Sequence, residues 1–137
     1  MSWLFALCLA AGNAHAEIPV HQFTLRWQHS IEKIDWEEDY VVAGNWLFLE
    51  SARVRGSGAG MEPPAGSYYS KGVWRYRPAP DMRWSQSLLL TRSEFARDYD
   101  ICIQGRCRPM ADWIPIASGN TTLTPCKVAS NAGQSER

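Results

Sequence analysis

The sequence predicts an all-β domain: a single small antiparallel β-sandwich or barrel, followed by a disordered C-terminal tail. Three observations favour this fold. Short segments with strand-like alternation recur along the chain, turn residues separate them at spacings of about eight to twelve residues, and no long segment has the apolar repeat of an amphipathic helix. The length of 137 residues is typical of one domain. Short, evenly spaced strands favour a sandwich or barrel over alternating strands and helices.

Alternation of apolar and polar residues defines the individual strands, because neighbouring side chains in a strand point to opposite faces. Residues 23–27 form the first strand, with Phe23, Leu25 and Trp27 on one face. Residues 46–54 form a long strand. Simple alternation there places Trp46, Phe48, Ala52 and Val54 on one face and Leu47 and Leu49 on the other.

Turn residues separate the remaining strands. Gly44-Asn45 suits a hairpin between residues 40–42 and the long strand, and Lys71-Gly72 and Gln104-Gly105 suit two further hairpins. The proline-rich residues 78–81 interrupt the chain. The other predicted strands cover residues 68–70, 73–77, 87–91, 98–103 and 106–108.

Both ends of the chain are expected to lie outside an all-β domain at residues 17–113. Residues 3–11 are apolar, and Ala14-His15-Ala16 resembles a signal-peptide cleavage site, so residues 1–16 are predicted to be a signal peptide. The apolar run is shorter than the roughly 20 residues that span a bilayer. Residues 114–137 are rich in small polar residues and are predicted to be a disordered tail. We therefore expect a soluble protein exported to the periplasm.

The four cysteines are consistent with an oxidising compartment. Cys102 and Cys107 bracket a predicted hairpin turn, and their spacing suits a small disulfide across it. A redox-active pair is less favoured, since no Cys-x-x-Cys begins a helix. Cys8 would leave with the signal peptide. Cys126 would then remain unpaired, as a free thiol or a residue without consequence.

The charges balance but are segregated along the chain. There are 14 basic and 14 acidic side chains, so general electrostatic binding to nucleic acid is disfavoured. Carboxylates crowd residues 32–39, whereas arginines dominate from residue 75 onward. Because arginine suits bidentate pairing with carboxylates, the two groups could partly neutralise each other within the fold.

The acidic block at residues 29–40 is the first candidate binding segment. Three chemistries remain open for it: cation binding by its carboxylates, acid–base or nucleophilic catalysis, and recognition of a partner through polar and aromatic side chains. A solvated acidic loop without a ligand is the alternative. Its candidate binding residues are His29, Ser30, Glu32, Trp36, Glu37 and Glu38.

The glycine-rich segment that follows is the second candidate. Successive backbone N–H groups in such a loop can bind a carboxylate or phosphate, although no Walker or dinucleotide motif is present. Alternatively, the glycines permit a tight connection, or their amides bind the acidic block itself. Its candidate residues are Arg55, Gly56, Ser57, Gly58, Gly60 and Glu62.

Three ordered motifs, at residues 27–40, 50–64 and 101–110, resemble an uncharacterised bacterial family, the one numbered eighteen-fifty among domains of unknown function. The resemblance covers roughly residues 23–113. It implies a small exported or membrane-tethered protein, often encoded beside TAXI-type tripartite (TRAP) solute transporters. It assigns no catalytic or binding residue.

These observations together predict a non-enzymatic periplasmic accessory or binding protein, associated with a TRAP-type transporter and without a cofactor, a metal or a nucleic-acid partner. Its expected partner is the transporter permease or the solute-binding protein, and its contact with the membrane runs through the transporter or an uncleaved signal. Two alternatives stay open. One is a small metal-dependent or Ser/His hydrolase built on His29, Ser30, Glu32 and Glu62, and the other is a purely structural exported domain.

Overall fold

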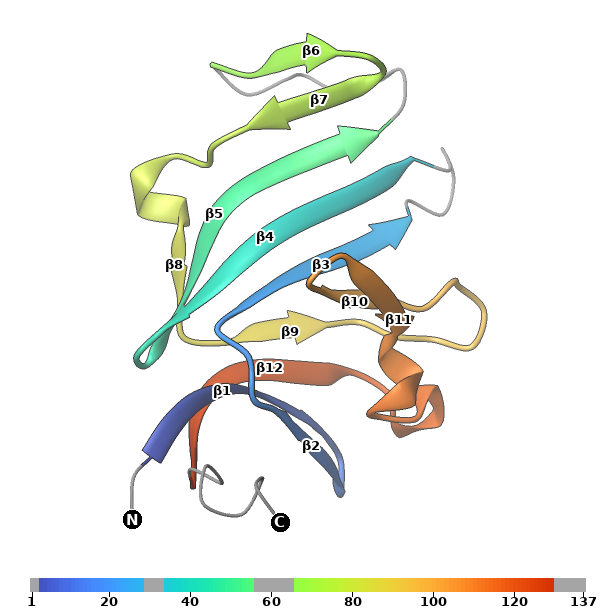
Figure 1. The fold of residues 1–137 in the computed structure, drawn as a ribbon. Helices are drawn as coiled ribbons and strands as arrows, with labels where there is room; N and C mark the ends of the chain where they lie inside the picture. The colour runs from blue at the N-terminus through green and yellow to red at the C-terminus, as the bar shows by residue number, and fades with distance from the viewer. Residues whose placement is uncertain (1–2, 29–33, 56–65, 130–137) are drawn as a thin grey trace.

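Two antiparallel sheets make up the fold (Figure 1), as the sequence predicts. The computed structural model describes residues 3–28, 34–55 and 66–129. The small sheet has the strand order β2 (Ala14–Ile18), β1 (Trp3–Ala11), β12 (Thr121–Ala129) and β9 (Leu88–Leu90). The large sheet has the order β11 (Arg106–Pro109), β10 (Asp100–Ile103), β3 (Gln22–Gln28), β4 (Asp35–Ala43), β5 (Trp46–Arg55), β7 (Val73–Tyr76) and β6 (Tyr68–Ser70), with β8 (Trp84–Ser85) also paired to β5.

The helices of the described residues are short 3-10 turns: η1 (Pro80–Met82), η2 (Met110–Asp112) and η3 (Ile116–Ser118). In these parts of the chain, no helix has the length and apolar character needed to cross a membrane. Strands therefore supply the framework. The turns η2 and η3 lie in the connection from β11 of the large sheet to β12 of the small sheet, whereas η1 lies between β7 and β8 of the large sheet.

The core lies between the sheets, where apolar residues from both inner faces meet. The small sheet contributes Leu7, Leu9 and Leu123, each fully buried. The large sheet contributes Leu25 and Ile101, among others. Along β3, buried Phe23 and Leu25 alternate with less buried residues, as expected for a strand with one core face and one outer face. In β1, residues 6–9 are all buried. The strands β6 and β7 lie at the end of the large sheet that is farthest from the small sheet (Figure 1).

The predicted hairpin at Gln104-Gly105 is confirmed. Gln104 and Gly105 adopt φ values of 52° and 80°, the left-handed region that a tight two-residue turn requires. Cys102 and Cys107 lie directly opposite each other in this hairpin and form the predicted disulfide.

The predicted faces of β5 are wrong in its second half. Leu47, Ala52 and Val54 are all buried, although simple alternation separates Leu47 from the other two. The register between β4 and β5 shifts between Asp39 and Tyr40, because Tyr40 pairs with Leu49 whereas Asp39 pairs with Ser51. The extra residue is a β-bulge, which reverses the faces of all later side chains on that strand.

The N-terminal segment belongs to the fold, which conflicts with the prediction of a signal peptide at residues 1–16. The apolar run is β1, an interior strand of the small sheet, and Leu7 and Leu9 lie in the core. The expected cleavage site lies in β2, which pairs with β1 after a turn at Gly12. An interior strand that is buried by the core and by two neighbouring strands can be as apolar as a signal peptide. Composition alone therefore does not distinguish an interior strand from a signal peptide.

The C-terminal segment is also structured up to residue 129, so the predicted tail at residues 114–137 is corrected; residues 130–137 lie outside the described part. Ile114 is fully buried, and β12 pairs with both β1 and β9. Threonines at alternate positions favour a strand despite their polarity. Cys126 is not unpaired, since it forms a disulfide with Cys8 on the adjacent strand.

A buried ion pair holds the irregular segments to the sandwich. The side chain of Arg92 is fully buried and donates from Nε and Nη2 to the two carboxylate oxygens of Asp98, each at 2.8 Å. Arg92 also donates to the Thr121 hydroxyl at 3.0 Å and to the Ile114 carbonyl at 2.9 Å. Removal of the guanidinium would leave a carboxylate without its cation, a loss of about 3–5 kcal/mol for buried pairs.

Replacement of Cys8 and Cys126 by alanine should lower the free energy of unfolding by about 3–5 kcal/mol, because this disulfide closes a long loop. The two cysteines are 118 positions apart. The matched control replaces Cys102 and Cys107, which are 5 positions apart and should contribute only about 2 kcal/mol. Urea denaturation of both double variants measures the difference, and equal losses would contradict it.

The pairing of β1 with β12 and β2 predicts that the mature protein retains residues 1–16. Non-reducing peptide mapping should recover a peptide containing Cys8 linked to one containing Cys126. A mature chain that begins at Glu17 would show instead that the segment is removed as a signal.

Candidate functional site

The acidic block divides between the two faces of β4. Trp36 and Glu38 lie opposite Trp27 and Leu25 of β3, on the core face. Glu37, between them, points to the outer face. The sequence prediction of one surface containing Trp36, Glu37 and Glu38 is therefore wrong in its geometry.

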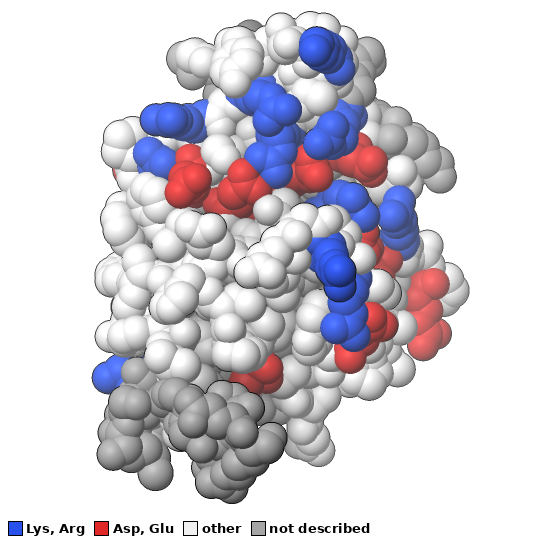
Figure 2. Space-filling model, viewed as in Figure 1, with Lys and Arg blue, Asp and Glu red and all other residues white. Residues whose placement is uncertain are grey.

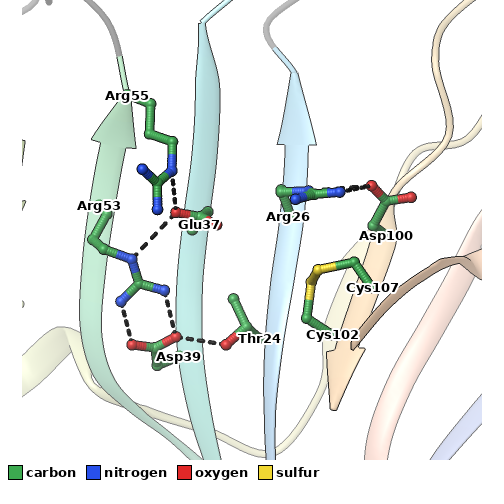
Figure 3. A network of polar contacts seen from close by, with 9 residues as sticks. All are labelled: Thr24, Arg26, Glu37, Asp39, Arg53, Arg55, Asp100, Cys102 and Cys107. Atoms are coloured by element: carbon green, nitrogen blue, oxygen red, sulfur yellow. Dashed lines mark hydrogen bonds and ion pairs between the residues drawn. A yellow bond between two sulfur atoms is a disulfide. The ribbon is translucent and has the colours of Figure 1, made fainter. Parts of the chain in front are cut away.

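Arg53 holds the outer carboxylates of β4 (Figure 3). Its Nε donates to Glu37 Oε1 at 3.2 Å, and its Nη1 and Nη2 donate to the two oxygens of Asp39. Arg55 Nε donates to the same Glu37 oxygen at 2.8 Å. Hydroxyl groups complete the network, since Thr24 and Ser51 donate to Asp39 at 2.6 and 2.7 Å.

Strand register explains why these groups meet. Glu37 pairs with Arg53 across β4 and β5, and Asp39 pairs with Ser51 on one side and Thr24 on the other. Directly opposite residues of an antiparallel pair place their Cβ atoms about 5 Å apart, within reach of a guanidinium and a carboxylate. The sequence suggests that arginines from residue 75 onward neutralise the acidic block. Among the described residues, the structure instead pairs Glu37 and Asp39 with arginines of β5, Arg53 and Arg55.

The network fixes the charge state of its central groups. Burial by itself raises the pKa of Asp39, but hydrogen bonds from Arg53, Thr24 and Ser51 outweigh it and lower the pKa to about 2. The hydrogen bonds to Asp39 likewise raise the pKa of the Arg53 guanidinium above its ordinary value. Both groups therefore stay ionised throughout the physiological pH range.

A second ion pair and a disulfide border the same outer face. Arg26 on β3 donates from Nε and Nη2 to Asp100 Oδ2 on β10 at 3.2 and 2.8 Å. Arg26 lines an open pocket of about 480 Å³, together with residues of the network around Arg53 and the disulfide between Cys102 and Cys107. The walls are thus fixed by ion pairs, a covalent bond and strand pairing.

An arginine-rich pocket of about 400 Å³ adjoins the first and shares Arg53 with it. Arg75 on β7 lies directly opposite Arg53 on β5, and Arg77 follows β7. In the part of the chain that the structure describes, no carboxylate oxygen lies within 4 Å of Arg75 or Arg77. Like charges placed opposite each other repel, so an anionic group in this pocket would relieve the repulsion. We call this site the arginine pocket; its lining residues are Ser51, Ala52, Arg53, Gly66, Tyr68, Arg75, Tyr76 and Arg77.

Charged side chains gather over the large sheet. Figure 2 shows acidic side chains between basic ones in the upper half of the view, whereas most of the described side chains in the lower half are uncharged. On the face shown, the charged side chains of the described residues are therefore concentrated over the large sheet.

Most of the predicted binding residues lie outside the described parts of the chain. Trp36, Glu37, Glu38 and Arg55 are described, and of these Glu37 and Arg55 contact each other. The hydrolase alternative depends entirely on residues outside the described parts and stays a prediction. The predicted residues outside the described parts are His29, Ser30, Glu32, Gly56, Ser57, Gly58, Gly60 and Glu62.

One cluster with metal-ligand side chains occurs in the described residues, made of Cys8, Glu17 and Cys126. Its two sulfur atoms are bonded to each other, so they are not available as thiolate ligands.

Sequence reasoning missed several residues of the outer face, namely Arg26, Asp39, Arg53, Arg75 and Asp100. Alternation along β3 and β4 identifies Arg26 and Asp39 as outward-facing. To predict that Arg53 pairs with Glu37, one must also know where the bulge in β5 lies, and alternation alone does not reveal this.

The family model described as "Domain of unknown function (DUF1850)" matches residues 23–110. The chain belongs to this family. The matched part of this DUF1850 domain contains every residue of the outer-face network and of the arginine pocket. It does not include β1, β2 or β12, which complete the small sheet. No curated protein and no solved structure matches the chain.

Stability should fall in acid through Asp39. Its folded pKa of about 2 is lower than the ordinary value of 3.8, so its contribution is fully present above pH 4 and is lost as the pH falls toward 2. Urea denaturation at a series of pH values measures the difference in unfolding free energy between the wild type and Asp39→Asn. This difference should shrink by about 1–2 kcal/mol as the pH falls from 6 to 2. Partial solvent contact screens the network and keeps the change this small. A difference that stays constant from pH 6 to pH 2 would contradict the role of Asp39. Asp81→Asn, on the exposed turn η1, is the matched control and should leave the curve unchanged.

Proposed function

We propose that this DUF1850 domain is an exported, non-enzymatic binding domain that acts as an accessory of a TRAP-type solute transporter. The outer face of the large sheet would contact its partner. One observation carries the proposal: the outer carboxylates are held by guanidinium groups in a fixed arrangement beside two open pockets.

The electrostatics of this face suit recognition better than proton transfer. General acid–base catalysis requires a group whose pKa lies near the working pH. Asp39 and Arg53 are instead kept ionised by each other. Charged groups that are already oriented lose little conformational entropy on binding and give specificity by complementary charge.

The arginine pocket supports a partner that presents an anionic group. Arg53 is neutralised by Asp39 and Glu37, while Arg75 and Arg77 add positive charge on the same side. A planar guanidinium binds a carboxylate or phosphate through two hydrogen bonds, and the hydroxyl of the nearby Tyr68 can donate a further bond. We therefore expect an acidic segment of the permease or the solute-binding protein at this pocket.

The disulfides support the proposed compartment. The bonds between Cys8 and Cys126 and between Cys102 and Cys107 account for all four cysteines. Such bonds persist in the periplasm and are rare in the cytosol, where thiols are kept reduced.

The proposal predicts that Arg75→Ala with Arg77→Ala weakens complex formation at least tenfold, about 1.4 kcal/mol, without unfolding the domain. Affinity purification of the full chain from periplasm and membranes, followed by mass spectrometry, should recover the transporter permease or its solute-binding protein. Titration of that purified component measures the affinity.

Arg106→Ala is the matched control, because Arg106 is an exposed arginine on β11 that lines neither pocket. It should leave the affinity unchanged. Normal solute uptake in a strain that lacks the domain, together with no recovered transporter component, would overturn the proposal.

A further inference from the structure

Glu38 faces a different cleft, on the core side of β4. This cleft has a volume of about 260 Å³ and lies at the border of the two sheets, because β3 and β4 supply one wall and β9 supplies the other. Its lining is mostly hydrocarbon and aromatic: Leu25, Trp27, Glu38, Tyr40, Leu88, Leu89, Leu90 and Tyr99. Glu38 supplies the carboxylate of this lining.

The surroundings of Glu38 differ from those of its two sequence neighbours. Glu37 and Asp39 each contact a guanidinium. Glu38 accepts a hydrogen bond from the Tyr40 hydroxyl at 2.9 Å, and no lysine or arginine nitrogen of the described residues lies within 4 Å of it. A partly buried carboxylate without a cation is costly, so a ligand that supplies positive charge would be favoured there.

The aromatic rings of Trp27, Tyr40 and Tyr99 line the same cleft. The centroid of the Trp27 ring lies 6.0 Å from that of Tyr99 and 6.1 Å from that of Trp36, to which it is nearly parallel. The faces of tryptophan and tyrosine rings attract cations through their negative electrostatic potential, most strongly where water is partly excluded. An organic ammonium ion can use the carboxylate, the rings and the hydrocarbon wall together.

We propose that this cleft binds a small organic ammonium ion, with the charged nitrogen at Glu38 and the apolar part against β9. The site lies on the opposite face of the large sheet from the arginine pocket. The proposal of an ammonium site does not depend on the proposed transporter partner.

The titration behaviour of the cleft agrees with its geometry. Burial raises the pKa of the Glu38 carboxyl above its ordinary value, although the hydrogen bond from Tyr40 opposes this. Among the described residues, the other titratable groups that face Glu38 are phenols. Burial and the negative charge of Glu38 raise the pKa values of Tyr76, on β7, and of Tyr99, in the segment before β10. None of these phenols carries positive charge, so the ionised carboxylate is not neutralised by them.

A metal ion fits the lining less well than an organic cation does. Calcium takes six to eight oxygen ligands, and zinc prefers nitrogen and sulfur. The cleft offers one carboxylate and phenolic oxygens among leucine and tryptophan side chains. Hydrocarbon walls contribute binding energy only to a ligand that has an apolar part.

The test compares n-butylammonium with 1-butanol, a neutral molecule of similar size. Titrations of the full chain are followed by tryptophan fluorescence and by the NMR signals of the indole N–H groups. We expect saturable binding of n-butylammonium and at least tenfold weaker binding of 1-butanol. No saturation by n-butylammonium up to about 50 mM, a concentration that reveals even millimolar affinity, would overturn the proposal.

Glu38→Gln keeps the size of the side chain and removes its charge. It should weaken n-butylammonium binding at least tenfold while leaving the thermal midpoint equal or higher, because it removes a partly buried charge. Glu94→Gln, in an exposed turn away from the cleft, is the matched control and should bind like the wild type. Equal affinity of the wild type and Glu38→Gln would overturn the proposal.

Discussion

The alternation of side chains along β4 is the constraint on which both candidate sites depend. This strand lies inside the large sheet, between β3 and β5. Consecutive acidic residues are therefore forced onto opposite faces, and each must be accommodated by a different set of neighbours. Glu37 and Asp39 are neutralised by arginines from β5, whereas Glu38 lies among aromatic and aliphatic side chains.

The pairing of the first and last described strands forms the centre of the small sheet, which packs against the large sheet. The strands β1 and β12 lie side by side through most of their lengths and are joined by the disulfide between Cys8 and Cys126. Their core-facing side chains cover part of the large sheet, and the buried pair of Arg92 and Asp98 ties the irregular segments to β12. The DUF1850 match covers the large sheet and β9, so the elements that complete the sandwich lie outside the matched residues.

The two faces of the large sheet offer contrasting chemistry. The outer face presents an ordered array of charges and an arginine pocket that suits an anionic group. The inner cleft has one carboxylate without a cation in the described residues, among aromatic rings, and suits an organic cation. The strand β4 thus supplies polar groups to two sites of opposite charge preference. The backbone of the large sheet lies between the two sites and separates their charged groups.

The sequence by itself determined the fold class, most of the large-sheet strands and the disulfide of the β10–β11 hairpin, because alternation and turn chemistry act over a few residues. It predicted β4 only at residues 40–42 and missed the acidic first half of that strand, which begins at Asp35. It did not determine the roles of the chain ends. An apolar segment can be a signal or an interior strand, and only the pairing of β1 with β12 selects between them and gives Cys126 its partner. Tertiary structure alone also decided which acidic residues meet arginine. That outcome depends on strand register and on one bulge in β5, and both are fixed by contacts between residues far apart in the chain.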